Sequence, residues 1–327
     1  MTKITSSLFL TVLFALGLHA ASAQAQLVRT CVSLAKGSDA NASSQCHCST
    51  PCRTFATAAA NTLADGEITV LDPGDYGGLT IIRSISINND SGGEASITVS
   101  QNTTGIIVNA VNGASYVNLR GITIQGVGFG TTTGLRFNTG LFLTMTNCTI
   151  RNHTGSGVEF FPNADSNLAV SNTLVSDNGG VGIFVQPTGS GTVRAVFNRV
   201  EAYNNSSHGI HVDGNSSTGT VNATVSESVA VNNHFSGFRV TSNAGKAVTN
   251  LMLVRSAAAD NGSGASGSGI FAASSATNTF ARISQSTVTG NDFGLLRSGA
   301  AELLSYGDNN IDGNGTDGTF SATLPKK

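Results

Sequence analysis

Two histidines and an aspartate stand close together in the segment SSHGIHVDGN, residues 206–215. His208, His211 and Asp213 could form a metal site, because imidazole nitrogens and carboxylate oxygens are common ligands of Zn²⁺. The same residue types could instead supply a proton acceptor and an ion ligand for breaking an acidic polysaccharide. A zinc site needs further ligands, and the sequence offers none nearby beyond Asp213. We therefore expect no metal site.

A second cluster of reactive side chains lies near the N-terminus. Four of the five cysteines occur within 22 residues: Cys31, Cys46, Cys48 and Cys52. In an exported chain such a group is expected to form two disulfides. The run CHCSTPC also contains His47, but its spacing matches no usual zinc pattern.

The first 25 residues have the pattern of an export signal. Lys3 is the only charged residue, residues 8–18 are apolar, and the small residues of AASAQAQ follow. This pattern predicts a cleaved signal peptide at 1–25 and a periplasmic or extracellular mature protein. The apolar run is shorter than the roughly 20 residues that span a membrane, and we expect no membrane span.

The composition excludes several classes of protein. Only 11% of the residues are charged, and the basic residues are scattered. Nucleic acid binding requires clustered basic residues, so we expect no such partner. Low charge combined with 39 glycines argues against a helical protein. Apolar residues recur regularly to the end of the chain, which argues against disorder.

A short piece with the pattern Gly, apolar, variable, apolar recurs along the chain. This is the alternation of a β-strand whose two apolar side chains share one face. The glycines of the pieces are separated by 23 to 32 residues: Gly105, Gly134, Gly157, Gly182, Gly209, Gly237, Gly269, Gly294 and Gly318. Coils of this length, with short strands and tight bends, form a β-solenoid.

A second motif precedes each glycine and ends in Asn or Asp. Its alignment predicts an inward column of Cys148, Thr173, Val200, Ser228, Ser256 and Ser286, followed two residues later by Ile150, Val175, Ala202, Ala230, Ala258 and Val288. The bend then holds Asn152, Asp177, Asn204, Asn232, Asp260 and Gly290, residue types that tolerate left-handed backbone angles. We expect an asparagine ladder at this bend and a buried structural thiol at Cys148.

These Asn bends and Gly-Ile-x-Val repeats resemble those of right-handed parallel β-helix proteins of the pectin-lyase-like group. The resemblance covers about residues 66–320 and implies an all-β, single-stranded, right-handed parallel β-helix, for which we expect ten to twelve coils. The group includes lyases, hydrolases, esterases, phage tailspikes and proteins of no known activity. The spacing of Cys46 and Cys52 resembles a cysteine pair in exported bacterial members. The resemblance therefore implies a Cys46–Cys52 disulfide, which leaves Cys31 for Cys48.

The chain is expected to contain one folded domain. We predict a signal peptide at 1–25, a disulfide-rich segment with a capping helix at 26–65, and the β-helix at 66–327. Within TPCRTFATAAANTLADG, Thr50 is predicted to cap the helix, Pro51 to lie in its first turn and Gly66 to end it. One face of this helix would cover the first coil with Phe55, Ala58, Ala59 and Leu63.

The variable position of each repeat faces away from the core, and stacking these positions gives a surface that we call the outer stripe. It comprises Ile107, Arg136, Glu159, Phe184, His211, Arg239, Phe271, Leu296 and Phe320. Aromatic rings that alternate with polar side chains suit polysaccharide binding, because the rings stack on sugar faces and the polar groups bond to sugar hydroxyls. Its predicted glycan-binding residues are Arg136, Glu159, Phe184, His211, Arg239 and Phe271. The alternatives are an exposed strand face of good β-formers, or a face covered by a loop, for which residues 260–269 are a candidate.

Catalysis makes stricter demands on the outer stripe. Glycoside hydrolysis uses two carboxylates, but Glu159 and Asp213 are two coils, or about 10 Å, apart. Neither has a carboxylate in an adjacent coil. The segment SHGIHV is similar to a Gly-His-Gly segment of polygalacturonases, whose acid pairs are absent here. A lyase could use His211, Asp213 and Arg239, with Ca²⁺ as the one cofactor considered.

The sequence therefore predicts an exported, monomeric and non-catalytic β-helix protein. Its expected partner is a polysaccharide or cell-envelope glycan bound along the outer stripe, with no cofactor. Two alternatives remain open. One is a lyase-like enzyme acting on acidic polysaccharide, and the other is a surface adhesin or structural rod.

Overall fold

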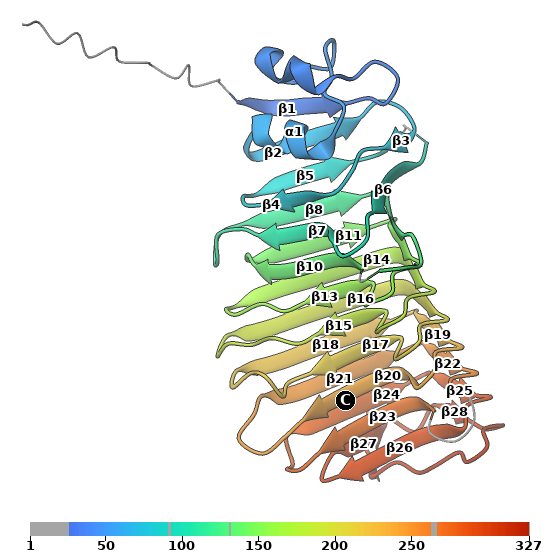
Figure 1. Cartoon of the computed structure of the whole chain (residues 1–327). Helices are drawn as coiled ribbons and strands as arrows, with labels where there is room; N and C mark the ends of the chain where they lie inside the picture. The colour runs from blue at the N-terminus through green and yellow to red at the C-terminus, as the bar shows by residue number, and fades with distance from the viewer. Residues whose placement is uncertain (1–25, 91–92, 131, 263–266, 327) are drawn as a thin grey trace, which may run out of the picture.

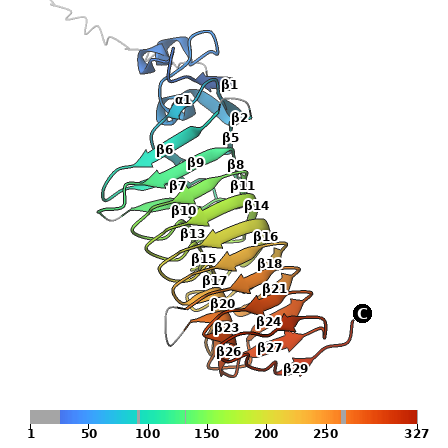
Figure 2. The ribbon, with the colours of Figure 1, turned by 90° about the vertical axis from the view of Figure 1, so that its right-hand side faces the viewer.

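Short strands stack in parallel along the whole described chain and form a β-solenoid, as predicted (Figure 1). The computed structural model describes residues 26–90, 93–130, 132–262 and 267–326. The predicted signal peptide lies outside these residues. Figure 2 shows the coils rising as an elongated stack, with the N-terminal segment at one end and the C-terminus at the other.

Each complete coil contributes one strand to each of three columns. The first column contains β1 (Leu27–Val32), β2 (Thr62–Val70), β5 (Ile85–Asn88), β8 (Tyr116–Arg120), β11 (Phe142–Thr146), the first part of β14 (Ser166–Ser176) and of β16 (Thr192–Tyr203), β18 (Thr220–Ser226), β21 (Val248–Val254), β24 (Thr279–Ser284), β27 (Glu302–Ser305) and β29 (Ala322–Thr323).

The second column is made of shorter strands. It contains β3 (Gly74–Asp75), β6 (Ala95–Val99), β9 (Ile122–Gly126), β12 (Thr149–Arg151), the ends of β14 and β16, β19 (Val229–Val231), β22 (Ala257–Ala259), β25 (Thr287–Thr289) and β28 (Asn310–Ile311). The first two columns are joined in one 20-stranded sheet.

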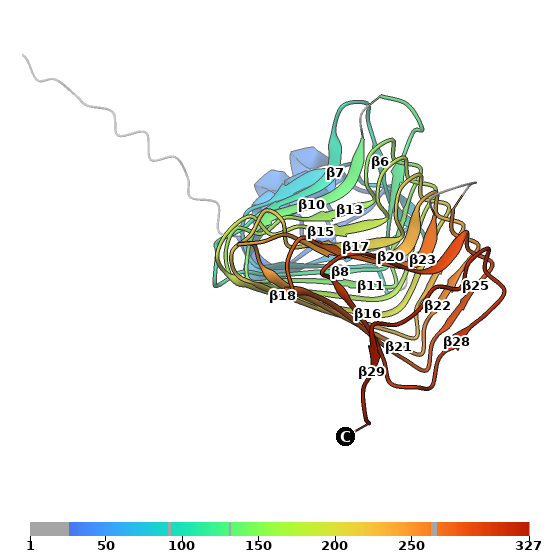
Figure 3. The same ribbon diagram turned by 90° about the horizontal axis from the view of Figure 1, so that it is seen from below.

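The third column is a separate nine-stranded sheet. It contains β4 (Leu79–Ile81), β7 (Thr104–Asn109), β10 (Thr133–Thr139), β13 (Val158–Phe160), β15 (Ile183–Val185), β17 (Ile210–Asp213), β20 (Ser236–Ser242), β23 (Ser268–Ser274) and β26 (Phe293–Gly299). Seen from below, this sheet lies across the coil from β8, β11, β16 and β18 (Figure 3).

The number of coils depends on the column in which they are counted. The described residues form nine complete coils, because the third column has nine strands. The first column is longer, with twelve levels from β1 to β29, because part-coils lie at both ends. The predicted ten to twelve coils are therefore too many, because the prediction counted the incomplete ends as coils.

The interior of the coils is filled by the predicted inward side chains. Both predicted columns are buried, from Cys148 and Ile150 to Ser286 and Val288. In the third column the rings of Phe137 and Phe160 stack with centroids 4.5 Å apart. Burial raises the pKa of the Cys148 thiol to about 11, so this side chain stays a neutral thiol. The prediction of a buried structural cysteine is confirmed.

The bend after the second column has the predicted left-handed backbone, but its buried ladder lies one residue later than expected. Asn152, Asp177, Asn204, Asn232, Asp260 and Gly290 all have positive φ, between 52° and 68°. The continuous ladder is formed by Asn178, Asn205, Asn233, Asn261, Asn291 and Asn314, whose side chains bond from coil to coil at 2.8–3.0 Å. Their amides satisfy one another inside the core, as buried polar groups must.

The capping helix is shorter than predicted. Helix α1 (Phe55–Asn61) has Thr54 as its N-cap, because Asp39 accepts the backbone N–H of Thr54 and holds it extended before the helix. The predicted cap at Thr50, first turn at Pro51 and end at Gly66 are therefore wrong. Strand β2 already begins at Thr62, since it pairs with β1.

The helix covers the first coil with part of the predicted face. Phe55 and Ala58 are buried, and the ring of Phe55 contacts Tyr76 at 5.0 Å. Ala59 packs against the core. Leu63 is 38% exposed because it lies in β2 and not in the helix, so its predicted place on the covering face is wrong.

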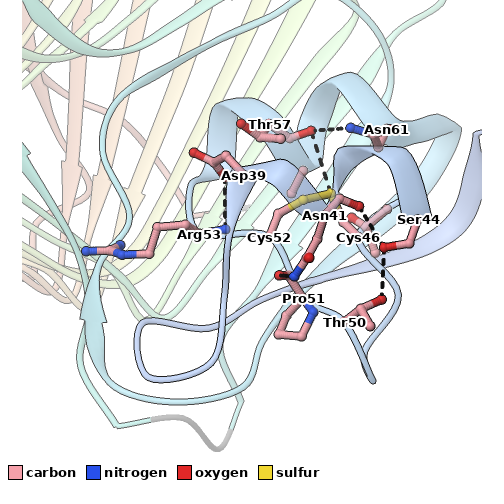
Figure 4. Close-up of a disulfide and its surroundings, with 12 residues drawn as sticks. Asp39, Asn41, Ser44, Cys46, Thr50, Pro51, Cys52, Arg53, Thr57 and Asn61 are labelled. Atoms are coloured by element: carbon pink, nitrogen blue, oxygen red, sulfur yellow. Dashed lines mark hydrogen bonds between the residues drawn. A yellow bond between two sulfur atoms is a disulfide. The ribbon is translucent and has the colours of Figure 1, made fainter.

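Two disulfides fasten the N-terminal segment, and they are the predicted ones. Cys31 is bonded to Cys48, and Cys46 is bonded to Cys52. Figure 4 shows the second bond beside α1 and the short 3-10 helix η1 (Asp39–Ser44). Because β1 pairs with β2, the segment before residue 66 forms the first level of the stack. The predicted start of the β-helix at residue 66 falls inside β2.

Candidate functional site

The outer stripe runs along the nine-stranded sheet. Strand register pairs its residues in the predicted order: Ile107, Arg136, Glu159, Phe184, His211, Arg239, Phe271 and Leu296. Residues 23 to 32 positions apart in the sequence are therefore neighbours on adjacent strands. This arrangement brings together every glycan-binding candidate and every catalytic candidate.

The predicted last member of the stripe, Phe320, faces the core instead. The backbone N–H of Leu295 donates to the carbonyl of Asp317 at 2.9 Å, and in the preceding coils the corresponding acceptor is the repeat glycine. Gly318 therefore comes one residue too late, and the inside–outside alternation after it is reversed. Phe320 packs against the core as a result, and its predicted place on the stripe is wrong.

The N-terminal half of the stripe carries an arginine that is already neutralised. Arg136 Nη1 lies 3.1 Å from Glu159 Oε2, and its guanidinium lies 5.1 Å from the ring centroid of Phe161. Burial raises the pKa of Glu159, while the Arg136 charge opposes this effect. We call Arg136, Glu159 and Phe161 the Arg136 site.

His211 and Asp213 point away from the core, as predicted, but neighbouring side chains cover them. The ring of Phe184 stacks on His211 at 4.9 Å and nearly parallel, with 12° between the planes. His211 is 8% exposed and Asp213 is 5% exposed. The expectation that they form part of an open surface is therefore wrong, because alternation gives a direction but not the size of the neighbours.

The carboxylate of Asp213 is fully engaged within the protein. It accepts hydrogen bonds from Gln186 Nε2 at 2.7 Å, Thr241 Oγ1 at 2.9 Å and the backbone N–H of Asn215 at 2.9 Å. His211 Nε2 lies 2.9 Å from Thr241 Oγ1. Since the single hydroxyl hydrogen of Thr241 goes to Asp213, His211 carries its hydrogen on Nε2. Burial, followed by the Arg239 charge, lowers the pKa of His211 to about 3.

The C-terminal half of the stripe carries a second arginine with a different neighbour. Arg239 lies 5.0 Å from the ring centroid of Phe271, and its Nη1 is 2.8 Å from Nε2 of His208. The backbone N–H of Ser236 donates to the other ring nitrogen of His208 at 3.2 Å. Burial, followed by the charges of His211 and Arg239, lowers the pKa of His208 to about 2. We call Arg239, His208 and Phe271 the Arg239 site.

No carboxylate lies within 4.0 Å of Arg239 in the described part of the chain. Burial lowers the pKa of this guanidinium, and the charge of Asp213 only partly opposes the effect. The guanidinium is thus partly removed from water without a counter-ion in contact. Such a group is stabilised by any anion that reaches it.

Arg239 also lines a surface hollow of about 420 Å³. The walls include Asn215, Thr241, Ser242, Asn243, Ala273 and Ser274. Two buried polar atoms at this hollow have no hydrogen-bond partner among the described residues, Arg239 Nε and Asn215 Oδ1. One donor and one acceptor beside the hollow are thus unpaired, but both atoms are covered by their surroundings.

Sequence reasoning identified Arg239 but not its surroundings. The direction of His208 could not be derived from strand alternation, because this residue precedes the strand. Asn215 follows the strand, in a loop whose path has no repeat signal. Among the described residues, no group of three or more His, Cys, Asp or Glu side chains is placed to hold a metal ion.

The family described as a right-handed beta helix region matches residues 83–252, which is more than half of the chain. The chain belongs to this family. Its coils are accordingly right-handed, as the resemblance implied. No curated protein sequence matches the chain. In the described residues no helix is long and apolar enough to cross a membrane.

Solved structures that are similar to this one include the following two. Pectate lyase Pel9A superimposes with a TM-score of 0.53 at 15% identity, over 87% of this chain and 78% of that protein. The A-module of the mannuronan C-5 epimerase AlgE4 from Azotobacter vinelandii gives a TM-score of 0.48 at 14% identity, over 90% of this chain and all of that module. At such low identity the likeness concerns the fold alone.

The loop proposed to cover the stripe spans residues 260–269, of which 263–266 lie outside the described residues. The cover over His211 comes from the ring of Phe184, which stacks on it. Phe184 and Phe271 themselves are half-buried. Each of these two rings therefore presents part of its surface to a ligand.

Proposed function

We propose that this protein is exported and, as a monomer without a cofactor, binds a polysaccharide or cell-envelope glycan along the outer stripe without converting it. The observation that carries the proposal is Arg239, which lies on Phe271 and beside the hollow with no carboxylate in contact among the described residues. Aromatic rings and a few convergent polar groups are typical of ligand sites. The name of pectate lyase Pel9A, which has a similar fold, says that it acts on pectate; this supports a glycan ligand only by analogy of fold.

The geometry of the catalytic candidates favours binding over turnover. A general base needs a pKa near the working pH, whereas His211 has a pKa of about 3 and His208 of about 2. Both oxygens of Asp213 accept hydrogen bonds from the protein. Glu159 is paired with Arg136. None of these side chains is free to remove a proton from a sugar.

A lyase-like enzyme acting on acidic polysaccharide is the second candidate. The observation that favours it is the register, which makes Arg239 the strand neighbour of His211 and places Asp213 two residues away. An arginine close to substrate could accept a proton only if its pKa fell far below its usual value. Continuous measurement of unsaturated product at pH 7, with and without Ca²⁺, separates the two candidates, because sustained turnover supports only the lyase.

Binding to a panel of insoluble plant, algal and bacterial polysaccharides tests the main proposal. We expect the double substitution Phe184→Ala and Phe271→Ala to abolish retention that the unsubstituted protein shows. The matched control is Phe280→Ala in the other sheet, where Arg282 lies 5.1 Å from the Phe280 ring. Equal retention of all three proteins would move the binding surface away from the stripe. No retention on any polysaccharide would favour a purely structural rod.

Localisation is tested separately from binding. The two disulfides favour an oxidising compartment. We expect the protein in the periplasmic or culture-medium fraction of the producing cells, with both disulfides formed. Recovery from the cytoplasm with reduced cysteines would contradict export.

A further inference from the structure

We infer that His208 makes the Arg239 site selective for a carboxylate-bearing sugar. The uncharged His208 ring occupies the position beside the Arg239 guanidinium that an internal carboxylate would otherwise take. This inference rests on the proposed glycan-binding function and specifies the class of ligand, a uronic acid residue within a polysaccharide. It depends on hydrogen-bond geometry around one imidazole ring.

Both ring nitrogens of His208 face hydrogen-bond donors. The backbone N–H of Ser236 points at Nδ1 from 3.2 Å, and Arg239 Nη1 lies 2.8 Å from Nε2. A neutral imidazole has one acceptor nitrogen and one N–H, and a protonated imidazole has no acceptor. At most one of the two contacts is therefore a hydrogen bond, and a proton added to the ring would face a second donor.

His208 consequently remains neutral and cannot neutralise Arg239. The ring is packed between the imidazole of His211 and the ring of Phe235, at 5.2 and 5.7 Å between centroids. The charged or titratable groups in contact with it are thus His211 and Arg239, and neither is an acid. Burial acts in the same direction, since it disfavours the charged imidazolium.

Most of the hydrogen-bonding capacity of Arg239 is unused. A guanidinium has five N–H donors, and the one hydrogen-bond contact made by Arg239 in the described residues is with His208. Asp213 lies close enough to raise the Arg239 pKa, but its oxygens are bonded to Gln186, Thr241 and Asn215. The site thus has a positive charge and N–H donors that no other described residue uses.

A uronic acid residue has the groups that this arrangement lacks. Its planar carboxylate can bond to two N–H groups of a guanidinium, a geometry that makes Arg–carboxylate pairs strong and specific. A neutral sugar would leave the guanidinium without a counter-ion. A sulfate ester also fits the guanidinium fork, but it is a weaker hydrogen-bond acceptor than the more basic carboxylate.

Two substitutions of equal length test the role of His208. Oligogalacturonate binding is measured by isothermal titration calorimetry at pH 7 with His208→Glu and His208→Gln. We expect His208→Glu to weaken binding at least tenfold, because Arg239 then acquires an internal carboxylate as Arg136 has. We expect His208→Gln, which adds no charge and leaves Arg239 without an internal carboxylate, to bind at least fivefold more tightly than His208→Glu. Equal affinities of the two variants would overturn the inference.

The unsubstituted protein provides a test that does not depend on the folding of a variant. We expect it to bind oligogalacturonate at least tenfold more tightly than the fully methyl-esterified oligomer, and carboxymethyl-dextran more tightly than dextran sulfate of equal charge density. Equal binding of the acid and its ester, or tighter binding of the sulfate, would overturn the inference and leave the proposed function intact. Absence of binding to any acidic or neutral glycan would defeat both.

Discussion

The Arg136 site and the Arg239 site each place an arginine guanidinium over a phenylalanine ring beside the nine-stranded sheet. They differ in the side chain that contacts the guanidinium. Each guanidinium lies over a phenylalanine ring, at 5.1 and 5.0 Å from the centroid. In the first site the adjacent side chain is the carboxylate of Glu159, at 3.1 Å. In the second it is the imidazole of His208, at 2.8 Å.

The main difference concerns charge compensation, although Arg136 is also more exposed than Arg239 and donates a further hydrogen bond to Asn138. Arg136 already has a counter-ion, so an acidic ligand would have to compete with Glu159. Arg239 has none in contact among the described residues and is partly withdrawn from water. The side chain in contact with each arginine, rather than the number of arginines on a surface, therefore decides whether an arginine can bind an anion.

The largest expected effect comes from removing each arginine in turn. Arg239→Gln should weaken oligogalacturonate binding about 30-fold, because a hydrogen bond to a charged group contributes about 1.5–3 kcal/mol. Arg136→Gln should change the affinity by less than about threefold, since its charge is already compensated. Calorimetric titration measures both. Equal losses in the two variants would show that the sites are equivalent.

The two sites should also differ in how they respond to pH, because only the Arg239 site contains a histidine, His208, whose ring packs against His211. The folded-state pKa of His211 is about 3, below the value of about 6.5 expected in the unfolded chain. The unfolded state therefore binds more protons between these values, and the stability present above pH 6.5 is lost as the pH falls. This loss is about 1.4 kcal/mol per pH unit for each such histidine, or about tenfold in the unfolding constant.

Urea unfolding at pH 7, 6 and 5 measures this dependence. His211→Gln should reduce the slope of stability against pH by about one proton, whereas Phe280→Ala, which removes no titratable group, should leave the slope unchanged. His208 and His153, whose pKa values are also lowered, would keep a slope in both variants. An identical slope with and without His211 would contradict the buried, neutral state of this side chain.

Removing the counter-ion of Arg136 should make the first site resemble the second. Glu159→Gln leaves the guanidinium over Phe161 but without a carboxylate in contact. We expect the affinity for oligogalacturonate to rise about fivefold, because one further charge-assisted hydrogen bond becomes possible. Calorimetry with the double variant Glu159→Gln and Arg136→Gln is the control. If the double variant also bound oligogalacturonate more tightly, the gain in affinity would not come from Arg136.

The smallest expected effect concerns the rings beneath the arginines. Phe271→Leu keeps an apolar side chain but removes a cation–π contact, for which exposed pairs contribute about 0.5–1 kcal/mol. We expect about threefold weaker binding. Phe161→Leu should not change the affinity measurably. Thermal unfolding of both variants separates a loss of contact from a loss of stability, and a greater effect of Phe161→Leu would reverse the proposed roles of the two sites.

The repeat in the sequence was sufficient to predict the fold and the neighbours along the stripe. The glycine spacing determines which residues lie in register, so Phe184, His211 and Arg239 could be placed on adjacent strands. Their burial could not be predicted, because it depends on how the ring of Phe184 leans on His211. Alternation within a strand gives the direction of a side chain and says nothing about contacts across coils.

Several of the predictions that the structure contradicts concern residues just outside the strands. Where two Asn residues are adjacent, as in Asn204-Asn205, composition does not tell which one turns inward. Near the C-terminus the alternation shifts by one residue and reverses the direction of Phe320. For the helix, the choice of Thr54 over Thr50 depends on Asp39, which is distant in the sequence. The contact between His208 and Arg239 has the same origin, since His208 lies in a bend.

The two ends of the stack are fastened unequally. Two disulfides secure the first level, whereas the last described strand, β29, pairs with β27 over two residues. A solenoid is stabilised mainly by contacts between adjacent coils. Unfolding under mild denaturant should therefore begin by fraying at the C-terminal end of the stack, which carries neither disulfide. The Arg239 site lies nearer that end than the Arg136 site, so a partly frayed molecule would lose the proposed glycan site while most of its strands remain ordered.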